Sequence, residues 1–96
     1  MGDRTSGLVD AVAILYGLPT GCSWIHTYRA WYLTRPDQPY GRIEFSDDPG
    51  RLGTLLGIGV HVPGLSVDMT PEVAAEHVLR WAVADIGARL AEVPRG

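Results

Sequence analysis

The sequence predicts a single α+β domain of order α-β-β-β-α, in which an N-terminal helix and a long C-terminal helix pack on an antiparallel meander. An apolar segment near the N-terminus ends at a glycine and a proline, and the middle of the chain alternates apolar and polar residues between turn signals. The last third is a long amphipathic stretch without a breaker. The 96 residues form one domain, 1–96, in which we expect 1–5 and 94–96 to fray.

The first element is a helix that begins at Ser6, whose hydroxyl can accept a hydrogen bond from a free amide of the first turn. Residues 8–16 are apolar apart from Asp10, so this helix is expected to be buried on most sides. Gly17 stands where helices often end in a left-handed residue, and Pro19 prevents continuation.

Residues Trp24 to Thr34 allow two interpretations. Most of them are β-branched or aromatic, which favours a strand. Ile25, Tyr28 and Tyr32 are also spaced as on one face of a helix. We favour the strand, and the helix stays open as the alternative.

Two clearer strands follow. Residues Tyr40 to Phe45 alternate, with Ile43 and Phe45 on the inner face. A further strand is predicted at Ile58 to Val62, and a short returning strand at Val67 to Met69.

The last helix has the strongest signals. Thr70 is a good N-cap, Pro71 suits the first helical position, and no strong breaker follows before Pro94. Its main apolar stripe is predicted to face the sheet and consists of Ala75, Val78, Leu79, Ala82, Ile86 and Leu90.

Trp81 lies roughly opposite that stripe and indicates a second apolar strip. The small residues beside it are Ala74, Ala84 and Ala88. The first helix could cover Trp81 inside the monomer. Alternatively, the strip binds a protein partner or a second copy, because interfaces use large aromatic side chains as anchors.

Residues 8–33 also contain a pattern that resembles a helix-turn-helix. Val12, Ala13 and Gly17 match its first helix and turn, although Gly21 and Cys22 look like an insertion. The resemblance implies a DNA-binding regulator whose second helix presents Thr20, Ser23, His26, Thr27 and Arg29 to a groove. The net charge of −3 provides no broad basic field, so nucleic acid is the less favoured partner.

The residue types that carry most catalytic and metal chemistry are scattered. These are Cys22, His26, His61, Asp68 and His77. The sequence has no His–x₃–His or Cys–x₂–Cys spacing that would fix two metal ligands on one element. We therefore expect no metal, no cofactor and no enzymatic activity.

Composition indicates the origin and the cellular compartment of the protein. All eight basic residues are arginine, as codon bias in a GC-rich genome would produce, and the one cysteine cannot form an internal disulfide. No segment reaches the length of a membrane span. We expect a cytoplasmic accessory or inhibitor-type protein of bacterial or phage origin, which binds a protein partner or forms a homodimer.

Overall fold

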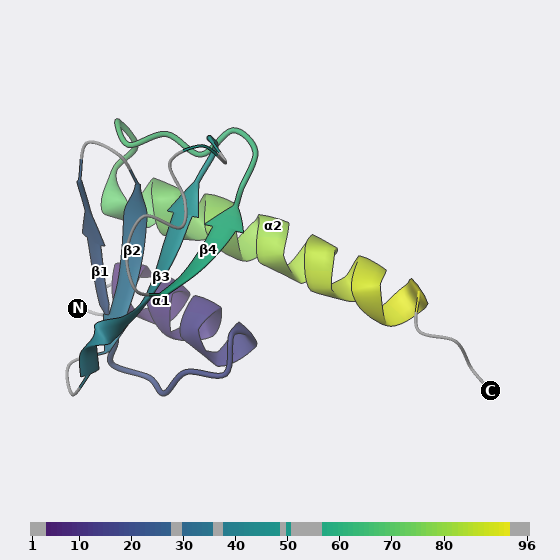
Figure 1. Cartoon of the computed structure of the whole chain (residues 1–96), viewed down its shortest axis with the longest axis horizontal. Helices are drawn as coiled ribbons and strands as arrows, with labels where there is room; N and C mark the ends of the chain where they lie inside the picture. The colour runs from purple at the N-terminus through teal and green to yellow at the C-terminus, as the bar shows by residue number, and fades with distance from the viewer. Residues whose placement is uncertain (1–3, 28–29, 36–37, 49, 51–56, 93–96) are drawn as a thin grey trace.

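A computed structural model describes residues 4–27, 30–35, 38–48, 50 and 57–92. The elements are α1 (Arg4–Leu15), β1 (Ser23–His26), β2 (Trp31–Arg35), β3 (Gln38–Ser46), β4 (Gly57–His61) and α2 (Pro71–Glu92). The four strands form one sheet in the order β1-β2-β3-β4, and both helices lie on the same face of it (Figure 1). The predicted α+β class is confirmed, with one strand more than expected.

Helix α1 begins at Arg4, so the predicted cap at Ser6 was wrong and residues 4 and 5 are helical, but the helix ends as its sequence predicts. Gly17 has a φ of 77°, and its amide donates to the Ile14 carbonyl at 3.1 Å. The Leu18 amide donates to the Ala13 carbonyl at 2.8 Å. These two bonds form a Schellman motif, which satisfies carbonyls that the end of a helix would leave unpaired.

The preference for strand over 24–34 is confirmed and the helical alternative was wrong, but the stretch forms two paired strands rather than one. β1 and β2 pair antiparallel, with Ser23 opposite Thr34, and the Thr27 amide donates to the Ala30 carbonyl between them. Residues 27–30 contain no glycine, proline, asparagine or aspartate, so the usual turn signals are missing. The run of strand-favouring residues is therefore uninterrupted, and the sequence alone does not divide it into two strands.

The sheet is mixed, and the expectation of a wholly antiparallel meander was wrong for its last pair. β3 pairs antiparallel with β2 but parallel with β4. Alternating residues determine which face a side chain occupies, and this holds for either direction of pairing. The pattern at Ile58 to Val62 therefore located the strand correctly without revealing its direction.

The returning strand expected at Val67 to Met69 is absent, since these residues lie in a turn in which the Met69 amide donates to the Ser66 carbonyl.

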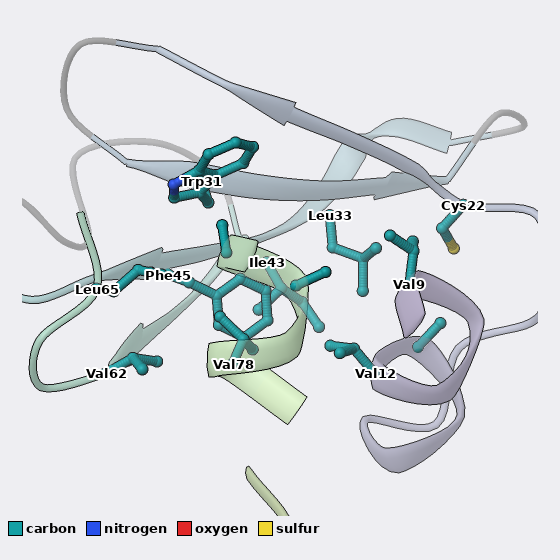
Figure 2. Packing of buried hydrophobic residues seen from close by; sticks show 13 residues of the cluster. Val9, Val12, Cys22, Trp31, Leu33, Ile43, Phe45, Val62, Leu65 and Val78 are labelled. Atoms are coloured by element: carbon teal, nitrogen blue, oxygen red, sulfur yellow. The ribbon is translucent and has the colours of Figure 1, made fainter. Parts of the chain in front are cut away.

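The core lies between the sheet and the helices (Figure 2). Trp31, Leu33, Ile43 and Phe45 point into it from β2 and β3 and are at most 4% exposed. The Trp31 indole Nε1 donates to the Ser66 carbonyl at 2.9 Å, which ties the hairpin to the loop before α2. From the helices, the core receives Val9, Val12, Ala13, Ala74, Ala75 and Val78.

Helix α2 begins at its predicted cap, because the Thr70 Oγ1 accepts a hydrogen bond from the Val73 amide. Of the predicted stripe, Ala75, Val78 and Ala82 are buried, and Leu79 and Ile86 are half-buried. The side chain of Leu90 lies outside the described residues.

After Ala82 the helix continues past the edge of the sheet (Figure 1). We call residues 83–92 the overhang. At 1.5 Å per residue its length is about 15 Å.

Candidate partner-binding site

A groove lies where the overhang leaves the sheet beside β4. Its lining comes from three elements: Tyr16 follows α1, Ile58, Val60 and His61 belong to β4, and Trp81 and Ile86 belong to α2. The groove has a volume of about 390 Å³. We call it the β4 groove.

Strand β4 forms one wall and is an edge strand, since it pairs with β3 on one side alone. Ile58 and Val60 stand beside Ile43 and Phe45 in the parallel register, so they belong to the helix-covered face. Val60 is half-buried and packs on the core, whereas Ile58 is 63% exposed. An edge strand has backbone N–H and C=O groups that no neighbouring strand pairs. Together with an exposed large apolar side chain, these groups can template the addition of another strand.

Helix α2 forms the opposite wall. Trp81 is half-buried, packs against the core and also lines the groove. Asp85 and Ile86, one turn later, continue the wall onto the overhang. Together with Tyr16, these side chains give the groove a mostly apolar lining, to which His61 and Asp85 add polar groups.

The predicted partner surface around Trp81 is not one continuous strip. Ala74 is fully buried in the core, so its place in that surface was wrong. The reason is geometric, because the buried stripe of α2 includes Ala74 together with Ala75 and Val78, and this side of the helix faces the sheet and α1. Ala84 is exposed, and it is not among the groove's lining residues. The side chain of Ala88 lies outside the described residues.

The helix-turn-helix geometry was wrong. Ser23 and His26 belong to strand β1, where His26 stands opposite Trp31 and the centroids of their rings are 4.5 Å apart. Thr20 precedes that strand and Thr27 follows it, while Arg29 lies outside the described residues. A DNA-binding function through residues 8–33 thereby loses the recognition helix on which it depended.

Two further hollows are lined largely by polar groups. One lies beside Thr5, Asp10 and Gly21, where the Asp10 carboxylate accepts a hydrogen bond from the Gly21 amide at 2.9 Å. The other lies beside His26 and Asp68. The β4 groove differs from both in having a lining that is mostly apolar.

The residues considered for metal or covalent chemistry are engaged in local contacts. His61 and His77 contact the carbonyls of Asp47 and Pro63 through Nε2, and the buried Cys22 thiol donates to the Pro19 carbonyl. Within the described ranges there is no group of three side chains that could hold a metal ion. Sequence reasoning singled out Trp81 but missed Tyr16 and Ile58, because no local signal marks β4 as an edge strand.

No helix within the described part of the chain has the length and apolar character needed to cross a membrane. Comparison with protein-family models, with curated proteins and with solved structures finds no match to this chain.

Proposed function

We propose that this chain is a small non-enzymatic protein-binding domain that holds a segment of a partner protein in the β4 groove. The observation that carries the proposal is that β4 is an edge strand beside the overhang. Its Ile58 lines the groove between them and is 63% exposed. Strand addition at such an edge gives affinity through backbone hydrogen bonds and specificity through neighbouring side-chain pockets.

The composition of the groove supports binding rather than catalysis. Its described lining is mostly apolar, although Tyr16, His61 and Asp85 carry polar groups. It contains Trp81 and Tyr16, and aromatic side chains of this kind are frequent anchors at protein interfaces. Composition supports a cytoplasmic accessory protein of bacterial or phage origin, because the chain uses arginine without lysine and has a single cysteine.

The test compares two substitutions of similar chemistry at exposed apolar residues. Ile58→Arg places a charge in the groove, while Val73→Arg places one on α2 at a residue that is 49% exposed and outside the groove. Affinity-tagged wild type and both variants are incubated with extract of the native host, and bound proteins, including untagged copies of the chain, are identified by mass spectrometry.

We expect wild type and Val73→Arg to retain the same partner and Ile58→Arg to lose it. All three must first show the same circular-dichroism spectrum, and each must melt cooperatively. Retention of the partner by Ile58→Arg, or no retention by any of the three, would contradict the proposed function.

A further inference from the structure

Helix α2 is longer than the sheet that it covers is wide. Its 22 residues span about 33 Å, whereas four strands at about 4.8 Å spacing span roughly 14 Å from β1 to β4. The overhang of about 15 Å corresponds to about three further strand positions. Asp85 and Ile86 of the overhang line the groove together with β4, and the C-terminal part of α2 continues beyond the last strand of the sheet (Figure 1).

Along the described residues of β4, two of the usual features that prevent edge pairing are missing. Residues 57–61 carry neither a charged Asp, Glu, Lys or Arg side chain nor a proline. Two copies of this strand can therefore approach one another without repulsion between like charges or loss of a backbone donor.

The strand is also complementary to itself. In an antiparallel pair about Gly59, Ile58 of one copy stands opposite the partner's Val60, and the reverse pair forms on the other side of the axis. Both residues belong to the face that the helices cover. Opposed β-branched side chains stabilise such a pair, and the glycine at the axis presents no side chain that would clash.

We propose that the occupant of the β4 groove is a second copy of this chain. The two β4 strands pair antiparallel about a twofold axis at Gly59, and each overhang then lies beside the other copy's β4, where Ile58 is exposed. The two four-stranded sheets become one continuous sheet, and the same surface serves on both subunits. This inference rests on the proposed function and names its partner.

The first experiment measures the mass of the purified chain by size-exclusion chromatography with light scattering. We expect twice the 10.4 kDa of one chain. Ile58→Arg is expected to raise the dimer dissociation constant at least about a hundredfold, because it removes an apolar contact twice per dimer and brings charges together. The matched control is Ile25→Arg, at a residue that is 47% exposed on the opposite edge strand, and it is expected to remain dimeric.

The second experiment tests the register by oxidative cross-linking. Ile58→Cys and Val60→Cys are made separately in a Cys22→Ala background, so that only the introduced thiols can pair. Directly opposed residues in antiparallel strands have Cα atoms about 4.5–5.5 Å apart, which a disulfide can span. We expect a covalent dimer when the two variants are mixed and little with either alone. Cross-linking by one variant alone, or none in the mixture, overturns the register.

The outcomes separate this inference from the proposed function. A monomeric wild type whose capture of a different host protein is lost in Ile58→Arg overturns self-pairing and leaves the proposed function in place. A dimer that Ile58→Arg does not weaken overturns the β4 interface. A monomer that shows no groove-dependent capture overturns both.

Discussion

At the scale of single residues, Glu44 is the least expected of the buried side chains. It lies on β3 opposite Tyr32, its side chain is buried, and its Oε2 has no hydrogen-bond partner within the described structure. Ile43 and Phe45 beside it point into the core. By alternation, Glu44 therefore belongs to the face of the sheet away from the helices. A buried carboxylate oxygen without a partner costs stability, because it has lost its hydration without gaining a hydrogen bond.

Glu44→Gln is therefore expected to stabilise the fold. The change keeps the shape and removes the charge, and we expect a gain of about 1 kcal/mol, or roughly 4–8 °C in melting temperature. Thermal melts followed by circular dichroism provide the measurement. The control is Glu76→Gln on α2, where the carboxylate binds Arg80 at 2.7 Å on an exposed surface, so that its loss costs about 0.3–0.5 kcal/mol. A lower melting temperature for Glu44→Gln would show that the carboxylate has a stabilising partner.

At the scale of elements, two glycines near α1 differ in what their backbone requires. Gly17 has a φ of 77° and ends the helix, whereas Gly7 lies inside α1 with nothing within 4 Å of where a Cβ would stand. A left-handed conformation costs a residue with a Cβ about 1–2 kcal/mol, while alanine inside a helix gains about 1 kcal/mol over glycine.

The same substitution is thus expected to have opposite effects at these two positions. Gly17→Ala should lower the free energy of unfolding by about 1 kcal/mol, and Gly7→Ala should raise it by about 0.5–1 kcal/mol. Urea denaturation of both variants and of wild type checks the signs. Equal shifts for the two variants would mean that the Schellman motif does not control the end of α1.

Trp81 on α2 contributes both to the core and to the groove. The sequence alone leaves open whether the first helix covers Trp81 inside the monomer or Trp81 anchors a partner. Only an interfacial Trp81 would allow Trp81→Ala to leave the melting temperature little changed. The structure packs Trp81 against the core as well as along the groove, so that substitution alters both stability and binding. Ile58 separates the two effects better, because most of its surface is exposed.

At the scale of the whole molecule, dimer formation links stability to protein concentration. If folding and pairing through β4 are coupled, the melting temperature of wild type should rise by about 3–5 °C for each tenfold increase in concentration. Ile58→Arg should melt at one temperature throughout, because it remains monomeric. Differential scanning calorimetry on a dilution series makes the comparison. A wild type without concentration dependence, or an equal dependence in the variant, would contradict coupling through this edge.

Much of the fold could be predicted because its signals are local. The Gly17 end of α1, the Thr70 cap of α2 and the alternation around Ile43 each act within a few residues of the chain. The α+β class follows from these elements, since each has one apolar face that must be covered. For the candidate site, the sequence provided Trp81 as an anchor and no more.

Sequence alone therefore determined the two helices, the C-terminal end of α1, the start of α2 and most strand positions, because capping and periodicity depend on neighbours along the chain. Only the tertiary structure decided that residues 23–35 turn back on themselves, that β4 runs parallel to β3, and that Ala74 is buried. It also decided that Ile58 and Trp81 meet in one groove. Strand direction, edge position and the covered side of a helix depend on contacts between distant segments, and one pattern of apolar residues is compatible with several such arrangements.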